Sequence, residues 1–316
     1  MTKTLNILML GGAKRVSVAQ LLKEAGAKEG VQVNIFSHEL STQEPIASVG
    51  TIIPGGKYSS PGIDDEIDSI ITEYGINIIL PFIDPAIAVA SRAKSRHNDV
   101  FVPVSPERTA TAMFDKVEAN KVFCAAEFPI PKSYTGDSIK YPAILKPRFG
   151  SASKGIIVAN CANDIKGITN FNDYLIQEYI ANRDEYTVDC YVGATDGAVK
   201  SITPRLRIAT AGGEVIRTET KRDARIIEAS EKVLSNIKFY GPVTLQFMFD
   251  RSTDRYLLME INPRLGGGVV CSILAGAPIV SYIIKEALGQ SVERDDTWRD
   301  HTLMARYFKE VMFYND

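Results

Sequence analysis

The chain has 316 residues and a formal net charge of −2, so it carries no general excess of cations that would attract nucleic acid. Hydrophobic residues make up 45% and charged residues 23%, a composition typical of soluble globular proteins with two or three packed units. No run of about 18 apolar residues predicts a transmembrane helix, no CxxC pair predicts a zinc site, and the three histidines form no metal-type pair. We therefore expect a cytoplasmic protein with reduced thiols.

The first third of the chain alternates predicted strands with predicted helices. The strands are expected at Leu5–Leu10, Val31–Ser37, Thr51–Ile53, Asn77–Phe82 and Val100–Val104, and the helices at Val16–Ala27, Ile63–Tyr74 and Pro85–Arg96. Continuous apolar strands that alternate with helices indicate a parallel sheet covered on both faces. This part is therefore predicted to be a Rossmann-like unit.

The first turn of this unit, Gly11-Gly12-Ala13-Lys14-Arg15, lacks the GxGxxG spacing of a dinucleotide-binding loop. No acidic residue ends the second strand cleanly. A tight strand-to-helix turn that needs small residues is therefore favoured over dinucleotide binding.

The rest of the chain is predicted to be richer in strands. A helix is expected over Ser105–Glu127, either continuous or broken near Met113–Phe114, and the prolines at 129 and 131 end it. Strands are predicted at Tyr141–Lys146, Gly155–Val158, Leu175–Tyr179, Glu185–Val192, Val199–Thr203, Pro242–Asp250 and Arg255–Ile261, and further helices at Arg222–Ile237 and Ala277–Leu288. A final stretch covers Leu303–Tyr314.

The most informative motif is Glu260-Ile261-Asn262-Pro263-Arg264 at the end of an apolar strand. Because side chains alternate along a strand, Glu260 and Asn262 share one face while Ile261 points into the core. Arg264 follows, where it could hold an anionic group. A structural sheet with Glu260 facing solvent is the alternative, and the dense apolar flanks disfavour it because an unpaired buried carboxylate is costly.

Gln246 lies 14 residues before Glu260, and the turn between them makes the two residues cross-strand neighbours in a simple hairpin. Gln246, Glu260 and Asn262 are therefore predicted to converge on one or two Mg²⁺ ions. Magnesium prefers oxygen ligands together with substrate phosphates.

A glycine- and serine-rich loop, residues 150–155, joins two predicted strands, whereas the glycines of a P-loop open a helix. Such a loop can fold over phosphates and donate backbone N–H groups. Lys146 ends the preceding apolar strand and is well placed for a phosphate under the loop. A surface hairpin with a snorkelling lysine is an equal alternative.

Polar groups also end the strand that carries Gln177-Glu178-Tyr179-Ile180. A strand edge there could offer backbone N–H and C=O groups to an adenine, and Glu185 could accept hydrogen bonds from ribose hydroxyls. The alternative is a half-exposed strand without a ligand.

Taken in order along the chain, these motifs resemble those of the ATP-grasp superfamily. The resemblance covers roughly residues 105–290, and within the superfamily the glutamine at the first metal position is most similar to the carbamoyl-phosphate synthase large-subunit branch, in a short or split form. It implies an α/β and α+β protein with a Rossmann-like pre-ATP-grasp domain (1–112), an ATP-grasp lid subdomain (113–186) and a C-terminal subdomain with the metal site (187–316).

The resemblance also implies roles for individual residues. ATP would be bound by Lys116, Lys146, Gly150, Ser151, Ser153, Gly155, Gln177, Glu178, Tyr179, Ile180 and Glu185. Magnesium would be bound by Gln246, Glu260 and Asn262. Arg264 would hold the carboxylate or the acyl phosphate, and with Lys146 and Asn262 would form the catalytic group. Arg205 and Arg207 are further candidates for anion contact, or ordinary surface arginines.

The implied activity is an ATP- and Mg²⁺- (or Mn²⁺-) dependent ligase that activates a carboxylate as an acyl phosphate for attack by an amine or similar nucleophile. Two alternatives remain at this stage: a single-module carbamoyl-phosphate-synthase-like enzyme acting on bicarbonate, and a non-catalytic ATP-binding regulatory protein. The expected partners are small-molecule carboxylates and amines, without nucleic acid or membrane, and a homodimer is a reasonable default.

Overall fold

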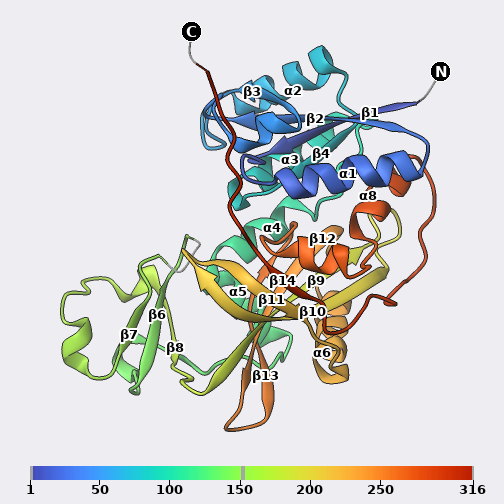
Figure 1. Cartoon of the computed structure of the whole chain (residues 1–316). Helices are drawn as coiled ribbons and strands as arrows, with labels where there is room; N and C mark the ends of the chain where they lie inside the picture. The colour runs from blue at the N-terminus through green and yellow to red at the C-terminus, as the bar shows by residue number, and fades with distance from the viewer. Residues whose placement is uncertain (1–2, 151–153, 315–316) are drawn as a thin grey trace.

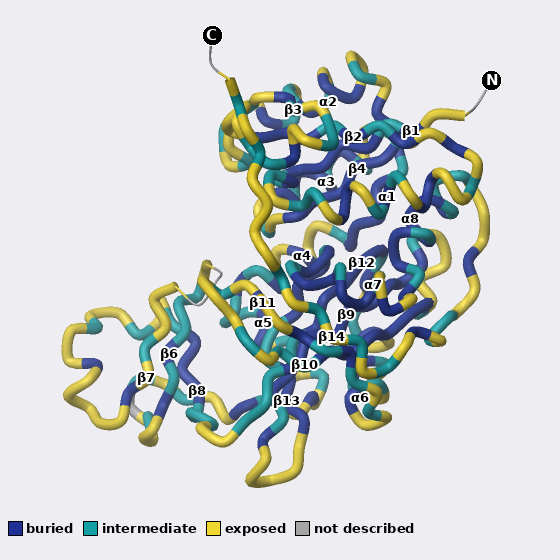
Figure 2. The backbone as a smooth tube through the Cα atoms, in the orientation of Figure 1, coloured by how far each residue is buried: buried dark blue, intermediate teal, exposed yellow. Residues whose placement is uncertain are grey.

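A computed structural model describes residues 3–150 and 154–314. Figure 1 shows three β-sheets: one in the N-terminal domain, one in a lid that projects to the side, and one at the centre of the C-terminal half. Most strand residues of the first sheet and of the middle of the central sheet are buried, whereas much of the lid is exposed (Figure 2).

The N-terminal domain is the predicted Rossmann-like unit. Its sheet is fully parallel and has the order β3-β2-β1-β4. The elements are β1 (Thr4–Leu10), α1 (Val16–Lys28), β2 (Gln32–Glu39), β3 (Thr51–Pro54), α2 (Ile63–Tyr74), β4 (Ile78–Pro81) and α3 (Asp84–Arg96). The apolar stripe Ile63, Ile67, Ile70 and Ile71 of α2 is buried, as its helical spacing predicts.

The predicted fifth strand, Val100–Val104, is wrong as a strand. The segment is extended and its three valines are buried, but it forms a single bridge, between Phe101 and Ile78. The Phe101 N–H donates to the Asn77 carbonyl, and the Phe101 carbonyl accepts from the Ile79 N–H. Pro103 then has no N–H to donate, which is consistent with the ladder ending there.

The helix predicted over Ser105–Glu127 is broken into two, α4 (Glu107–Phe114) and α5 (Lys116–Ala125). The break lies at Asp115, just after the position considered from the sequence. The Asp115 carboxylate accepts hydrogen bonds from the backbone N–H groups of Val117 and Glu118, at 3.0 and 3.3 Å. An aspartate at this position caps a new helix, so α5 begins here.

The lid is a four-stranded antiparallel sheet with the order β5-β8-β6-β7. Its strands are β5 (Ser133–Tyr134), β6 (Ala143–Pro147), β7 (Ile157–Ala159) and β8 (Tyr174–Glu178). The buried core of the lid is small and centres on Leu145, Ala159, Ile165 and Ile176. Short 3-10 helices lie at Pro45–Ser48, Gly136–Ser138, Ala162–Ile165 and Phe171–Asp173, the first of them in the N-terminal domain.

The C-terminal half is built on a six-stranded antiparallel sheet with the order β13-β12-β9-β10-β11-β14. The strands are β9 (Arg183–Val192), β10 (Val199–Ala211), β11 (Glu214–Thr220), β12 (Gly241–Asp250), β13 (Arg255–Asn262) and β14 (Leu303–Ala305), and the helices are α6 (Ala224–Asn236), α7 (Val269–Leu274) and α8 (Ile279–Ala287). Short turns at Asp196-Gly197 and at residues 211–214 join the neighbouring antiparallel strands β9 and β10, and β10 and β11.

The two halves share a hydrophobic core. Helix α8 packs beside α1 (Figure 1), and Ile283, Ile284 and Trp298 are buried in the same cluster as Ile7 and Leu22 of the N-terminal domain. Of the predicted domain limits, the one after residue 112 falls inside α4 and the one after residue 186 falls inside β9. The shared core fixes the N-terminal domain against the large sheet, so side chains from both can meet in one site.

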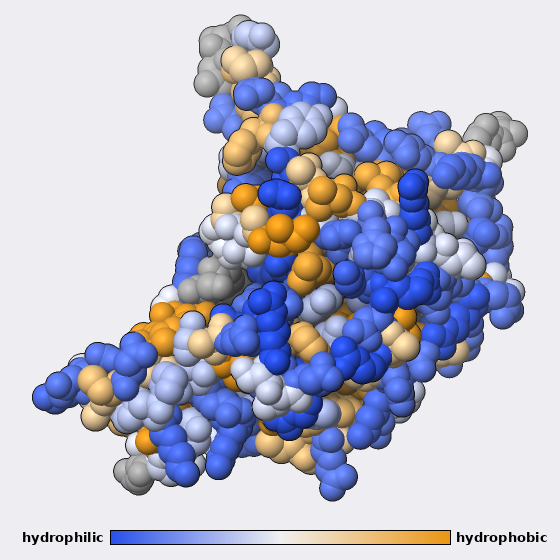
Figure 3. All heavy atoms as spheres, turned by 60° about the horizontal axis from the view of Figure 1, so that its bottom comes forward, coloured by the Kyte–Doolittle hydropathy of each residue, from blue (hydrophilic) through white to orange (hydrophobic). Residues whose placement is uncertain are grey.

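No helix in the described part of the chain is long and apolar enough to cross a membrane. On the face shown in Figure 3, hydrophilic side chains cover most of the surface and hydrophobic ones form smaller patches.

Candidate functional site

A cavity of ≈ 860 Å³ lies where the lid, the large sheet and the N-terminal domain meet. Most of the predicted site residues line it: Lys116, Lys146, Gly150, Glu178, Tyr179, Ile180, Glu185, Gln246, Glu260, Asn262 and Arg264. Gln177 and Gly155 do not line it, and Ser151 and Ser153 lie outside the described residues. The size of the cavity is in the range of small-molecule sites.

One face of the large sheet supplies the floor of this cavity. In the strand register, Gln246 pairs with Glu260 on one side and with Thr187 on the other, and Thr187 pairs with Arg205. These four residues form a row across four strands because directly paired residues share a face of the sheet. The predicted cross-strand pairing of Gln246 with Glu260 is therefore confirmed.

A second row lies beside the first. Asn262 pairs with Thr244, Thr244 with Asp189, and Asp189 with Thr203. The register of β13 shifts between its pairs Gln246–Glu260 and Phe247–Leu258, which leaves Met259 as an extra residue. Such a bulge re-aims nearby side chains, and here both Met259 and Glu260 line the cavity.

The three predicted metal ligands are held close together. Asn262 donates a hydrogen bond through Nδ2 to Glu260 Oε1 at 2.9 Å, which leaves its amide oxygen directed to Arg264 Nη2 at 3.2 Å. Gln246 Oε1 accepts from Arg207 Nη1 at 3.2 Å. Glu260, Gln246 and Asn262 supply oxygen ligands for a metal, but only one of these is a carboxylate. Among the described residues, no group of three or more Asp, Glu, His or Cys could hold a metal ion. This donor set fits Mg²⁺, which keeps waters and shares phosphate oxygens.

Lys146 faces the sheet from the end of β6 in the lid. Its ammonium donates to Gln177 Oε1 at 2.9 Å, while the Gln177 amide donates to Asn120 Oδ1 at 3.0 Å and lies close to Pro131 O. Burial lowers the pKa of Lys146 to about 8, opposed by the charge of Glu260. The side chain of Gln177, a residue predicted to bind ATP, therefore contacts Lys146 and does not line the cavity.

The second predicted lysine, Lys116, begins α5 next to the glycine-rich loop. Its ammonium donates to the carbonyl oxygen of Gly150 at 2.7 Å. Arg148 pairs with Asp115, with 2.6 Å between Nη2 and Oδ2, and its carbonyl accepts from the Lys116 N–H. These contacts tie the strand that leads into the loop to the start of α5.

The predicted adenine end carries its own internal contacts. Glu178 Oε1 accepts from the Lys132 N–H at 2.9 Å, and Ile180 O accepts from Arg183 Nη1 at 2.7 Å. The Arg183 guanidinium lies over the Tyr179 ring, 5.3 Å from its centre. Glu185 forms ion pairs with Arg183 at 3.2 Å and with Arg207 at 3.8 Å. The groups predicted to bind adenine and ribose thus surround one end of the cavity.

Arg264 lies at the opposite end, at the junction with the N-terminal domain. Its Nε donates to Asp84 Oδ1 at 2.6 Å, and both side chains are only 14% exposed. Asp84 begins α3 directly after β4, and Arg15 precedes α1 in the turn after β1; both line the same cavity. Neither residue was predicted as part of the site. The available signal was their place at the carboxyl ends of parallel strands, where ligands bind in such sheets.

The sequence left two roles open for Arg205 and Arg207, anion contact or ordinary surface arginines. Both line the cavity, so neither is an ordinary surface arginine. Arg205 is 2% exposed and pairs with Asp189, with 2.7 Å between Nε and Oδ2. Asp189 also accepts from the Ser272 hydroxyl at 2.6 Å. Burial lowers the pKa of Arg207, and the charge of Glu185 opposes this.

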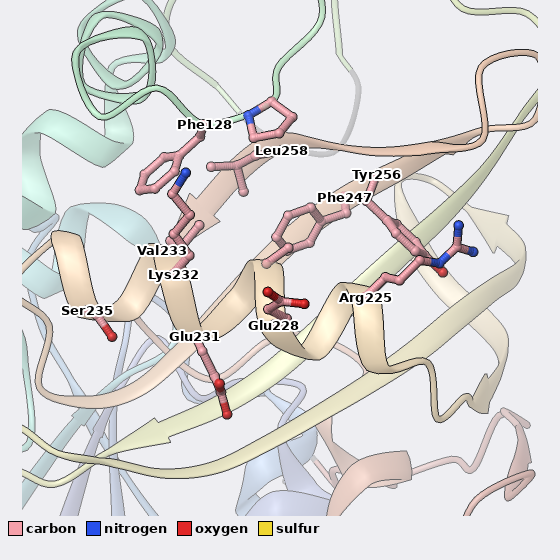
Figure 4. A pocket seen from close by; sticks show the side chains of 12 residues that line it. Phe128, Arg225, Glu228, Glu231, Lys232, Val233, Ser235, Phe247, Tyr256 and Leu258 are labelled. Atoms are coloured by element: carbon pink, nitrogen blue, oxygen red, sulfur yellow. The ribbon is translucent and has the colours of Figure 1, made fainter.

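A second hollow, of ≈ 480 Å³, lies between α6 and the hairpin of β12 and β13. Figure 4 shows Phe128, Phe247 and Leu258 in this hollow, with charged α6 side chains such as Glu231 at its rim. None of the predicted site residues lines it. The larger cavity is therefore the candidate active site.

Comparisons with known proteins find a family model, sequence relatives and solved structures that are similar to this chain. A family described as "ATP-grasp in the biosynthetic pathway with Ter operon" matches residues 170–311. The carbamoyl phosphate synthase large chain of Clostridium acetobutylicum is 22% identical over 208 residues, covering 57% of this chain and 19% of that protein. Mitochondrial methylcrotonoyl-CoA carboxylase subunit alpha of Arabidopsis thaliana is 23% identical over 239 residues, covering 65% and 32%. The chain thus spans a fifth to a third of the length of these two relatives.

Solved structures share the fold across nearly the whole chain. The biotin carboxylase domain of the Hydrogenobacter thermophilus 2-oxoglutarate carboxylase, in complex with MgADP, ADP and bicarbonate, aligns with a TM-score of 0.74 at 17% identity, covering 94% of this chain and 73% of that one. N5-carboxyaminoimidazole synthetase from Staphylococcus aureus, complexed with ADP, aligns with a TM-score of 0.73 at 18% identity, covering 93% and 80%.

The L-amino acid ligase from Bacillus licheniformis aligns with a TM-score of 0.70 at 15% identity, covering 91% and 75%. The predicted fold class, a Rossmann-like domain followed by a two-part ATP-grasp fold, is confirmed by these structures. The family model over residues 170–311 and the sequence relatives are ATP-grasp proteins as well, so the chain is similar to this superfamily in both sequence and fold.

Proposed function

We propose that this chain is an ATP- and Mg²⁺-dependent ligase that activates a carboxylate as an acyl phosphate for attack by an amine or similar nucleophile. One observation carries the proposal: Lys146 on the lid, the Gln246, Glu260 and Asn262 oxygens on the sheet, and Arg264 at the domain junction all face a single cavity. A protein that only binds a nucleotide would have no need for Arg264 at this position.

The residues present fit the cofactor and the nucleotide. Glu260, Gln246 and Asn262 would hold Mg²⁺, and Lys146 and Lys116 would neutralise phosphate oxygens. Glu185 and the groups around Tyr179 would bind the nucleoside. When bound, the metal would supply charge neutralisation at the phosphates.

The chemistry then needs no protein nucleophile. A carboxylate oxygen attacks the γ-phosphorus of ATP, a new O–P bond forms, and the bond to the bridging oxygen breaks to release ADP. The amine next attacks the acyl carbon, a C–N bond forms, the C–O bond to phosphate breaks, and the amine loses a proton. Because both first reactants are anions, the contribution of this chain is alignment and cationic stabilisation by Lys146 and Arg264.

The acyl phosphate must be shielded from water until the amine reacts. The lid has a small core and contacts α5 through hydrogen bonds from Lys116 to the Gly150 carbonyl and from the Gln177 amide to Asn120. We infer that it covers the phosphates during turnover, which is the usual role of such loops in excluding water.

The test is phosphate release by the purified chain with ATP, Mg²⁺ and a panel of carboxylates, with hydroxylamine as a general nucleophile. We expect release that depends on the carboxylate, and a loss of about 100-fold or more in Glu260→Gln, since this change removes the carboxylate from the metal set. Arg225→Gln, an exposed arginine on α6, is the matched control. Undiminished turnover by Glu260→Gln would show that the metal assignment is wrong.

Bicarbonate belongs in the same panel because the Hydrogenobacter domain was solved with bicarbonate and carbamoyl phosphate synthase is a sequence relative. Turnover stimulated by bicarbonate alone would favour the carbamoyl-phosphate-synthase-like alternative. Tight ATP binding without phosphate release across the panel would favour a regulatory nucleotide binder. A homodimer and a cytoplasmic location stay predictions.

A further inference from the structure

Two guanidinium groups flank the glycine loop that follows Arg264. Gly267 and Gly268 are adjacent, and both line the cavity. A Cβ atom on Gly267 would lie 3.4 Å from Arg15 Nη1, and one on Gly268 would lie 2.6 Å from Arg205 Nη1. The absence of side chains on these two residues therefore leaves both guanidinium groups next to the loop backbone. Arg15 and Arg205 come from different domains, and the shared core holds them at this place.

Both groups lack a full set of partners. Arg205 Nη1 is buried and has no hydrogen-bond partner among the described residues, although Nε and Nη2 of the same side chain contact Asp189. An unpaired buried donor of this kind is costly. Arg15 is 17% exposed, and its described ion pair is a long one of 3.7 Å to Glu214, a half-exposed carboxylate that pairs more closely with Arg306, at 2.9 Å.

The charges around the loop do not balance. Four guanidinium groups, those of Arg15, Arg205, Arg264 and Arg306, are paired with three carboxylates, those of Asp84, Asp189 and Glu214. One positive charge is therefore left over. Burial lowers the pKa of Arg15, Glu214 opposes this, and the charges of Arg264 and Arg306 lower it further. The guanidinium groups of Arg15, Arg264 and Arg306 repel one another, and a bound anion would reduce this repulsion.

A single reacting carboxylate does not use all of this charge. The proposed function assigns that carboxylate to Arg264, which already has Asp84 as a close partner. Arg15 and the free Nη1 of Arg205 would then remain under-paired inside the same cavity. Guanidinium groups bind carboxylate and phosphate oxygens with strong, directional hydrogen bonds.

We propose that the acid this enzyme activates carries a second anionic group, a carboxylate or a phosphate, which binds Arg15 and Arg205 beside Gly267 and Gly268. The proposal rests on the proposed ligase function and narrows its substrate class. Arg15 is then a specificity-determining residue that the N-terminal domain contributes to the acid-binding end of the site.

The experiment compares matched acids in the phosphate-release assay, each pair differing by one anionic group. Propionate is compared with succinate for a second carboxylate, and glycerate with 3-phosphoglycerate for a phosphate. We expect kcat/KM to be about tenfold or more higher for one of the dianionic acids than for its monoanionic partner. The pair that shows the preference identifies which second group the site takes.

The Arg15→Gln variant tests the assignment to this residue. It should lower kcat/KM for the preferred dianionic acid about 10- to 100-fold, mainly through KM, and change the monoanionic partner less than threefold. Arg225→Gln should change neither. Equal use of both acids by the unchanged enzyme, or an equal loss for both in Arg15→Gln, would overturn the proposal.

Failure of the ligase function itself looks different, because no acid would then release phosphate. Anion binding then tests the proposed second-anion site without turnover. Thermal unfolding is measured with propionate, succinate or inorganic phosphate at about 10 mM, a concentration on the order of weak anion affinities. Stabilisation by succinate or phosphate but not by propionate, lost in Arg15→Gln, would support the second-anion site. Stabilisation that Arg15→Gln leaves unchanged, or none at all, would contradict it.

Discussion

The protonation state of Lys146 makes a quantitative prediction about nucleotide binding. Burial lowers the pKa of this lysine to about 8, so the ammonium is charged at pH 7 and largely neutral at pH 9. If only the charged form binds the phosphates, the competent fraction falls about tenfold between these pH values. The dissociation constant for Mg²⁺ with a non-hydrolysable ATP analogue should therefore rise up to about tenfold.

Calorimetric titration of the analogue at pH 7, 8 and 9 measures this effect, and Lys146→Arg is the matched variant. A guanidinium stays charged over the whole range, so Lys146→Arg should bind with little dependence on pH, whatever its affinity at pH 7. Parallel pH profiles for the two proteins would refute the reasoning, because ionisation of the nucleotide or of another side chain would then explain the change.

Two more predictions concern the groups that hold the site together. Arg205→Met should destabilise the fold by about 3–5 kcal/mol because Asp189 would be left buried with the Ser272 hydroxyl as its remaining side-chain contact. Arg225→Gln, at an exposed ion pair, should change the stability little. Urea unfolding measures both variants, and equal losses would contradict the burial argument. Asp84→Asn should lower kcat/KM for the acid about tenfold with little change in nucleotide affinity, since it weakens the 2.6 Å contact that positions Arg264. An equal loss of ATP binding would show instead that Asp84 shapes the whole cavity.

Much of the fold followed from local patterns. The isoleucine spacing of α2, the apolar strands β1 and β4, and the hairpin that pairs Gln246 with Glu260 depend on interactions between residues close in sequence or on simple register. The break considered near Met113–Phe114 is present, since α4 ends at Phe114, but the capping contacts of Asp115 that start α5 could not be read from the sequence.

The parts of the site that depend on contacts between distant segments were harder to predict. Arg15 and Asp84 meet the motif at Arg264 only because α8 and Trp298 pack into the N-terminal core. Gln177 lies in a predicted binding segment, yet its side chain points to Lys146 and Asn120 because strand alternation places it on the opposite face from Glu178. Alternation separates Gln177 from Glu178, but only the contacts with Lys146 and Asn120 show which of the two faces the cavity.

The central claim is that a substrate carboxylate attacks the γ-phosphorus of ATP. An acid labelled with ¹⁸O in its carboxylate tests this directly, because one labelled oxygen becomes the bridge of the acyl phosphate and leaves with phosphate when the amine attacks. Mass spectrometry of the released phosphate should then find one ¹⁸O atom for each turnover. Phosphate without label, or label in AMP, would contradict the claim.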